Sequence, residues 1–153
     1  MGDSRWKPNV TVAAVVEQAG RYLLVEEASP RGPVLNNPAG HLDPGESLIA
    51  AVVREVLEET ACTFTPTHLV GVYLTRSAHS DITYLRFAFA GLVSDPEPGR
   101  ALDAGILRVV WLAPETIDAE RARHRSPLLS QCIADHRAGR HYPLDLLHHV
   151  GSG

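Results

Sequence analysis

Residues 40–61 read GHLDPGESLIAAVVREVLEETA. Their first part contains Pro44 and Gly45, which interrupt regular structure. From residue 47 to residue 61, by contrast, apolar side chains recur at helical spacing with polar residues on the other side. These apolar residues are Leu48, Ile49, Val52, Val53, Val56 and Leu57. The stretch therefore predicts an irregular loop that leads into an amphipathic helix of about four turns.

The polar face of this helix carries three glutamates. Glu55, Glu58 and Glu59 are spaced i, i+3 and i+4, so their side chains point the same way. Like charges at these spacings repel by roughly 0.2–0.5 kcal/mol per pair, and neither position 62 nor 63 offers a cation to offset them. Carboxylate oxygens are ligands that Mg²⁺ accepts, which makes metal binding one interpretation. A solvated surface rich in glutamate is the other.

The segments around this unit predict a sheet and two further helices. Extended runs of strand type occupy residues 10–16, 21–27, 69–75, 82–92 and 107–112. The turn between the first two runs predicts a hairpin. Further helices are expected to begin at Pro114 and at Ser126-Pro127, the second ending at Gly139. The fold class expected is α+β, with a mixed sheet between helices.

Length and composition limit the kind of protein. The chain has 153 residues, of which 44% are apolar and 21% are charged, as in a single globular domain. Its apolar runs are far shorter than the ~18 residues of a membrane helix, and it begins without a signal core, so a cytoplasmic location without a membrane partner is expected. A net charge of −4 offers no basic surface for duplex nucleic acid. Cys62 and Cys132 are expected to be buried free thiols.

Seven residues of the opening stretch match a family signature. The signature reads G, five residues, E, seven residues, then R-E-U-x-E-E-x-G-U, where U is a bulky aliphatic residue. The chain therefore resembles the Nudix (MutT-like) hydrolases, although Ala61 and Cys62 stand at the last two positions. The matching residues are Gly40, Glu46, Arg54, Glu55, Val56, Glu58 and Glu59. Segments such as Leu85-Arg86-Phe87 and Tyr142-Pro143-Leu144 resemble the NudJ-type phosphatases of that family, and the likeness spans roughly residues 8–147.

The resemblance implies a Nudix fold, an α/β/α sandwich, and a metal site. One domain is expected at residues 8–147, between a flexible N-terminus, 1–7, and a flexible tail, 148–153. Mg²⁺, or Mn²⁺ in its place, would be held by Glu55 and Glu59 as principal ligands, with Glu58 binding a further ion. Gly40, Glu46 and Arg54 would be structural residues of the loop and helix.

The implied reaction needs a base, because a carboxylate must take the proton of the attacking water. Glu55 and Glu58 are the candidates within the helix. In this family the base sometimes comes from a separate loop, where the candidates are Asp95, Glu97 and Asp103. The choice among these carboxylates stays open at this point.

The resemblance further implies hydrolysis of a pyrophosphate bond in a small molecule, with release of phosphate. The NudJ-type phosphatases act on thiamine pyrophosphate, hydroxymethylpyrimidine pyrophosphate and nucleoside di- and triphosphates. A different Nudix specificity, such as ADP-ribose, dinucleotide polyphosphates or RNA ends, is one alternative, and a non-catalytic ligand-binding module is another. Arg86 and His41 are candidate phosphate contacts and Tyr84 a candidate stacking partner, although each also suits a structural role. The chain is expected to be a monomer or a homodimer.

Overall fold

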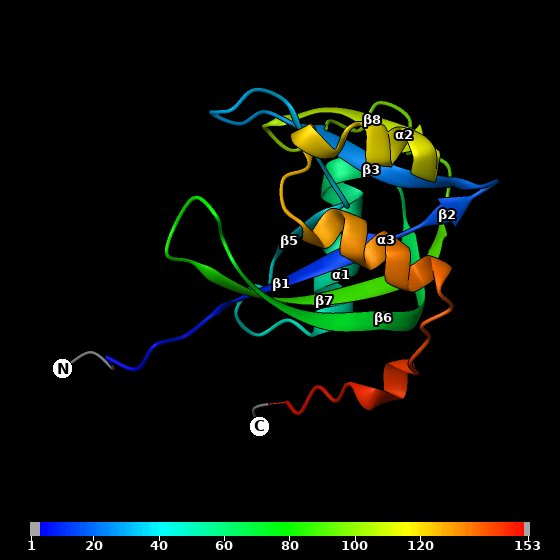
Figure 1. Cartoon of the computed structure of the whole chain (residues 1–153). Coiled ribbons are helices and arrows are strands. Elements are labelled where there is room, and N and C mark those ends of the chain that lie inside the picture. The colour runs from blue at the N-terminus through cyan, green and yellow to red at the C-terminus, as the bar shows by residue number, and fades with distance from the viewer. Residues whose placement is uncertain (1–3, 152–153) are drawn as a thin grey trace.

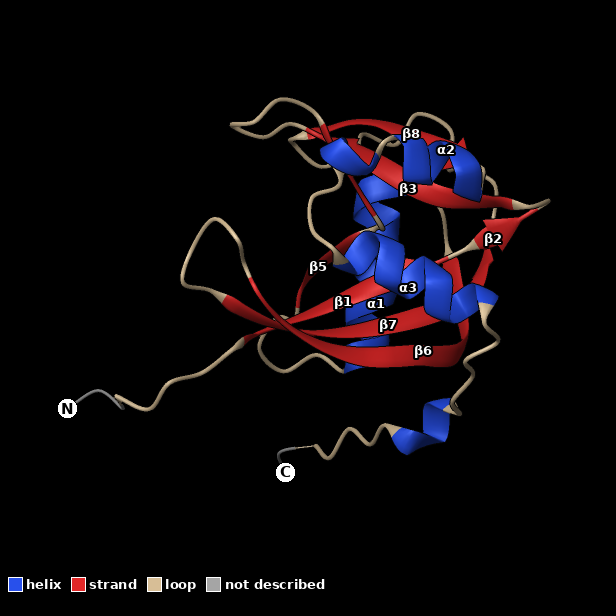
Figure 2. Cartoon of the chain, viewed as in Figure 1, coloured by secondary structure: helices blue, strands red, loops and turns tan. Residues whose placement is uncertain are grey.

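The computed structural model describes residues 4–151, so the expected flexible ends, 1–7 and 148–153, extend beyond the described range. Two four-stranded sheets and three α-helices make up this part of the chain (Figures 1 and 2). The strands are β1 (Asn9–Val15), β2 (Glu17–Gln18), β3 (Arg21–Glu27), β4 (Val34–Asn36), β5 (Ala39–His41), β6 (Phe64–Arg76), β7 (Thr83–Val93) and β8 (Ile106–Leu112). The helices are α1 (Leu48–Thr60), α2 (Pro114–Ala119) and α3 (Leu128–Arg137), with 3-10 turns at Arg121–Arg123 and Leu144–Leu146.

The first sheet has the strand order β5-β1-β7-β6. Its β1 and β7 strands run parallel and its other neighbours run antiparallel, so the sheet is mixed as predicted. The second sheet joins β2, β3, β4 and β8 in antiparallel pairs. The mixed sheet and the helices confirm the α+β fold class.

None of the described helices is long and apolar enough to cross a membrane.

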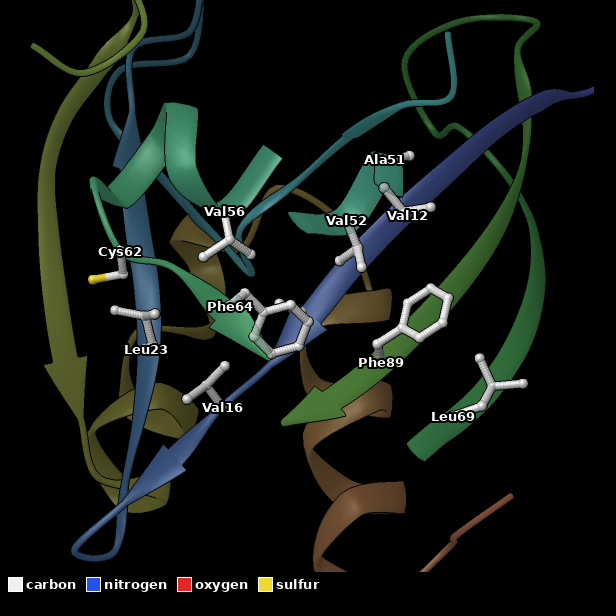
Figure 3. Close-up of a cluster of buried hydrophobic side chains, with 11 residues drawn as sticks. Val12, Val16, Leu23, Ala51, Val52, Val56, Cys62, Phe64, Leu69 and Phe89 are labelled. Atoms are coloured by element: carbon white, nitrogen blue, oxygen red, sulfur yellow. The ribbon is translucent and has the colours of Figure 1, made fainter. Parts of the chain in front are cut away.

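The two faces of the first sheet are covered by different helices. On one face, Val52 and Val56 of α1 pack with Phe89 of β7 and with Leu23 of the second sheet (Figure 3). On the other face, the apolar side of α3, including Leu129, packs against β1, β6 and β7. The mixed sheet thus lies between helices. The buried free thiols expected at Cys62 and Cys132 are confirmed.

The central helix α1 begins and ends as its sequence predicts. The Ser47 side chain accepts a hydrogen bond from the backbone N–H of Ala50 at 3.0 Å, which caps the N-terminus. At the other end Ala61 adopts the left-handed conformation, with φ at 64°, and its N–H donates to the carbonyl of Leu57 at 3.0 Å. The glycine of the signature would adopt this conformation without strain. Alanine at position 61 therefore preserves the geometry of the helix end but lowers the stability of the fold by roughly 1–2 kcal/mol relative to glycine.

The hairpin predicted between residues 10–16 and 21–27 is wrong. Strand β1 pairs with β5 and β7, whereas β3 pairs with β2, β4 and β8 in the other sheet. The turn itself exists, but it joins β3 only to the two-residue strand β2. Because β1 and β3 are both apolar on both faces, each satisfies the pattern of a buried strand in either sheet.

Two predicted boundaries also shift. Strand β6 begins at Phe64 rather than at residue 69, and the register with β7 shifts between Pro66 and His68, which accommodates a proline within the strand. Helix α3 begins at Leu128, one residue later than predicted, and its first N–H donates to the Ser126 hydroxyl at 3.2 Å.

Candidate functional site

A cleft of about 970 Å³ opens where α1, β5 and β7 meet the segment that leads into α3. Six of the nine predicted site residues line it, namely Gly40, His41, Glu55, Glu59, Tyr84 and Arg86. The other three, Glu46, Arg54 and Glu58, belong to the adjoining loop and helix and are joined by hydrogen bonds. The fold thus gathers residues from one helix and two strands at a single place.

Three carboxylates form a compact acidic group beside the cleft. Glu55, Glu58 and Asp103 each place one oxygen within 4.8 Å of the others. Asp103 comes from the loop at 94–105, and its backbone N–H donates to the carbonyl of Glu58 at 2.9 Å. Oxygen donors at this spacing suit a hard divalent cation. Of the three loop acids considered from the sequence, Asp103 alone joins this group among residues 4–151.

Asp95 and Glu97, the other loop candidates, have different surroundings. Glu97 pairs with Arg100 at 3.1 Å, and its backbone N–H donates to the carbonyl of Ala61 at the end of α1. Both Asp95 and Glu97 are exposed. Spacing along a helix predicts that Glu55 and Glu58 face the same way, but the approach of a loop residue more than forty positions later depends on the tertiary fold.

Glu59 has a separate environment on the same helix. Its Oε1 accepts a hydrogen bond from the backbone N–H of Ala39 in β5 at 2.9 Å, and the residue is only 8% exposed. Burial, assisted by the neighbouring charges of Glu27, Glu55 and Asp103, raises the pKa of Glu59 to about 8. Burial also raises the pKa of Glu55. The cleft therefore holds carboxyl groups that are costly to ionise in the absence of a cation.

We expect Glu59 to make the stability of the metal-free chain depend on pH. Its pKa of about 8 in the folded state exceeds the ordinary value of 4.5, so between these values the folded state binds more protons than the unfolded state. The free energy of unfolding attributable to Glu59 should therefore fall as the pH rises from about 4.5 to about 8. Glu59→Gln removes the titration and keeps an oxygen for Ala39. In EDTA, the Tm of the variant should rise relative to that of the natural chain across this range, whereas a constant difference would contradict the assignment.

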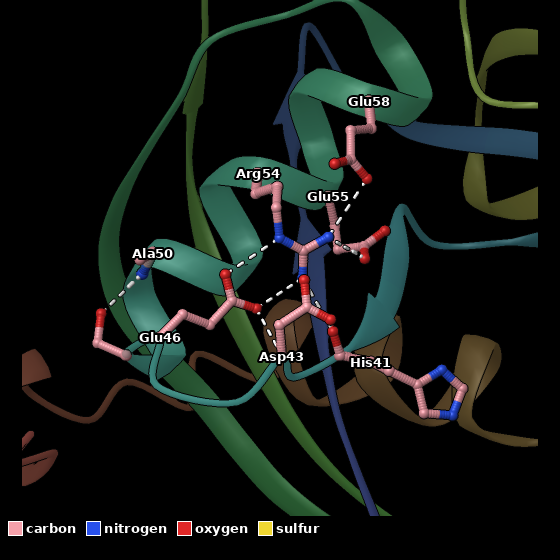
Figure 4. Close-up of polar contacts among 8 residues, drawn as sticks. His41, Asp43, Glu46, Ala50, Arg54, Glu55 and Glu58 are labelled. Atoms are coloured by element: carbon pink, nitrogen blue, oxygen red, sulfur yellow. Dashed lines mark hydrogen bonds and ion pairs between the residues drawn. The ribbon is translucent and has the colours of Figure 1, made fainter.

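Arg54 ties the loop to the acidic group (Figure 4). Its Nε and Nη2 donate to the two carboxylate oxygens of Glu46 at 3.0 and 2.6 Å, a bidentate pair. Its Nη1 donates to Glu55 at 2.7 Å and to Glu58 at 3.3 Å, and Nη2 also reaches the carbonyl of His41 at 2.9 Å. The hydrogen bonds from Arg54 lower the pKa of Glu46. One guanidinium thus orients two carboxylates of the acidic group as well as the loop.

Gly40 lies directly against Glu55. A Cβ atom built at position 40 would stand 2.1 Å from Cδ of Glu55 and 2.3 Å from each of its carboxylate oxygens. Real Cβ atoms essentially never make contacts under 3.0 Å. The absent side chain at position 40 therefore leaves the space that the Glu55 carboxylate occupies.

The three predicted substrate contacts lie on strands β5 and β7. The rings of His41 and Tyr84 lie with their centroids 6.2 Å apart, and both residues line the cleft. Arg86 is buried and donates to the side-chain oxygens of Asn36 and Asn37 at 3.3 and 3.1 Å. Neither asparagine is among the site residues predicted from the sequence. Their only signal is a consecutive polar pair beside an apolar strand.

Comparisons with known proteins agree on one family. A family model described as the NUDIX domain matches residues 6–132. Phosphatase NudJ of Escherichia coli K12 is 35% identical over 142 residues, which cover 93% of this chain and 92% of that protein. A solved NUDIX hydrolase from Nitrosomonas europaea is 54% identical with a TM-score of 0.92, covering 96% of this chain and 100% of the other. The NUDIX domain of Shewanella oneidensis NrtR, complexed with ADP ribose, is similar in fold alone, at 19% identity, a TM-score of 0.71 and coverage of 89% and 90%.

Proposed function

The chain belongs to the NUDIX hydrolase family, and from this premise we propose that it is a NudJ-like phosphatase that uses a divalent metal ion. Its substrates are small organic diphosphates or nucleoside di- and triphosphates, from which it releases phosphate. The observation that carries the proposal is the acidic group of Glu55, Glu58 and Asp103 next to a cleft lined by Arg86. This arrangement suits a ligand with several anionic oxygens, some of which bind a cation held by the carboxylates while others bind the guanidinium of Arg86.

The carboxylates supply the donor set that the metal needs. Glu55 and Glu58 would hold Mg²⁺, or Mn²⁺ in its place. Glu59 would add a further carboxylate from the next turn of α1, once a cation offsets the cost of ionising it. When bound, the ion neutralises phosphate oxygens and lowers the pKa of a water molecule.

The remaining chemistry belongs to the side chains of the chain. Arg54 keeps Glu55 and Glu58 in place, and Gly40 leaves room for the Glu55 carboxylate. A carboxylate of the acidic group takes the proton of the attacking water. Asp103 suits this role, because its side chain makes no hydrogen bond within residues 4–151, whereas Glu55 and Glu58 both accept from Arg54. Attack of the water on phosphorus then breaks the anhydride bond and releases the distal phosphate.

A panel of substrates tests the proposal. With Mg²⁺, the purified chain should release inorganic phosphate from thiamine pyrophosphate and from nucleoside di- and triphosphates, and EDTA should stop the release. ADP-ribose belongs in the panel because its cleavage yields two monophosphates and no inorganic phosphate. Turnover of ADP-ribose alone would replace the proposal by another NUDIX specificity. Failure on every member, with either Mg²⁺ or Mn²⁺, would favour a ligand-binding module.

A further inference from the structure

Arg86 is a buried cation that no carboxylate of residues 4–151 neutralises. The residue is 6% exposed, and its guanidinium donates to Asn36, to Asn37 and, at 3.9 Å, to the sulfur of Cys132. All three partners are uncharged acceptors. A guanidinium stays ionised at any pH at which proteins fold, and burying a charge without a counter-charge is costly. The folded chain therefore has a position at which an added anion would be stabilised.

The atoms left without partners around Arg86 are donors. Within the described residues, the buried side-chain nitrogens that lack a hydrogen bond are Nε of Arg86 and Nδ2 of Asn37. Both require an acceptor rather than another donor. A ligand that reaches Arg86 from the cleft must therefore bring acceptor oxygens, and the charge of Arg86 favours anionic ones. The fork of a guanidinium matches the oxygens of a phosphate particularly well.

The register of the sheet places Arg86 close to the acidic group without joining it. Thr11 of β1 pairs with His41 of β5 on one side and with Arg86 of β7 on the other, so one strand separates β5 from Arg86. The Arg86 guanidinium reaches Asn36 and Asn37, three and two residues before Ala39, whose N–H donates to Glu59. Arg86, Asn36 and Glu59 line the same cleft. A ligand in this cleft would therefore meet carboxylates as well as the guanidinium of Arg86.

We propose that Arg86, positioned by Asn36 and Asn37, binds a phosphate group of the substrate in the cleft that Glu55 and Glu59 also line. The assignment of the ligand as a substrate phosphate rests on the proposed function, whereas the anion-binding property rests on the burial and hydrogen bonds of Arg86. Two phosphates share this chemistry: the one that is released and the one that stays on the organic group.

Binding of the two reaction products separates these cases without turnover. Inorganic phosphate and thiamine monophosphate are each titrated by calorimetry into the full chain in the presence of Mg²⁺. Arg86→Met should weaken the binding of one of them by about 10- to 100-fold, the range expected when a charge-assisted hydrogen bond is lost. Arg86→Lys keeps the positive charge but lacks the paired N–H donors of a guanidinium, so it should weaken binding by an intermediate factor. The product that loses affinity identifies the phosphate that Arg86 holds.

Arg108→Met is the matched control. Arg108 is exposed, pairs with Glu26 at 3.3 Å and is not among the residues that line the cleft, so its removal should leave both affinities unchanged. Thermal unfolding shows whether Arg86 acts instead as a structural residue: a lowered Tm with unchanged affinities in Arg86→Lys would overturn the proposal. If Arg86→Met does not fold, Arg86→Lys decides the question.

The proposal fails if neither product binds the natural chain, or if both bind the folded Arg86 variants as tightly as the natural chain. These outcomes are distinct from a failure of the proposed function. If the protein hydrolyses none of the panel but Arg86→Met weakens phosphate binding, the anion site at Arg86 stands and the proposed function fails. If the protein hydrolyses the panel but binds both products equally well without Arg86, the proposed function stands and the anion site fails.

Discussion

Gly40→Ala is expected to lower kcat/KM for a diphosphate substrate by at least about 100-fold, because misplacing a reacting group by about 1 Å has an effect of that size. The new Cβ atom would stand 2.1 Å from Cδ of Glu55, so either the Glu55 carboxylate or strand β5 must move. Movement of β5 would also disturb the hydrogen bond between Ala39 and Glu59. Overpacking of this kind costs roughly 1–3 kcal/mol, so the variant should fold with a reduced Tm. Steady-state kinetics and thermal unfolding measure the two effects.

Gly20→Ala is the control for the loss of stability alone. Gly20 lies in the turn between β2 and β3 with φ at 79°, and a Cβ atom there would meet nothing within 4 Å. The substitution therefore introduces backbone strain at a residue that does not line the cleft, and kcat/KM should stay unchanged. If Gly40→Ala were as active as Gly20→Ala, the close packing of β5 on Glu55 would have no bearing on the reaction.

The sequence predicts those parts of the fold that depend on local periodicity. Helix α1 follows from apolar spacing and lies within the predicted range, 47–61, and the structure adds Ser47 as its N-cap. Strands β1 and β3 are equally clear as strands, but their pairing is not a local property. Each is buried on both faces, so no alternation of polar residues marks its partner, and the chain passes from one sheet to the other at Val16.

The site divides in the same way. Positions i, i+3 and i+4 bring the glutamates of α1 to one face, which spacing alone predicts. Their environments differ for tertiary reasons: Glu58 lies near Asp103, whereas Glu59 is buried under the N–H of Ala39. Arg86 shows the same limit, since an alternating strand allows both an exposed and a buried arginine. Its burial depends on α3 covering that face of the sheet.

Glu55→Gln should lower kcat by about 10²- to 10⁴-fold while the chain remains folded, the range expected for loss of a group that acts in the reaction. The substitution keeps the size of the side chain and an oxygen that can accept from Arg54, but it removes a negative charge from the acidic group. Because burial raises the pKa of Glu55, the charged form opposes folding in the metal-free chain. The Tm in EDTA should therefore stay the same or rise at neutral pH. The activity is thus expected to fall without a loss of stability.

Glu115→Gln is the matched control for the charge change, since Glu115 is an exposed residue in the first turn of α2. It should leave both kcat and the Mg²⁺ dependence of the rate unchanged. For Glu55→Gln, titration of the rate with Mg²⁺ separates two effects: a lost ligand raises the concentration of Mg²⁺ needed, whereas a lost base lowers kcat at saturating Mg²⁺. Phosphate release from Glu55→Gln at the rate of the natural chain would exclude the Glu55 carboxylate from the reaction.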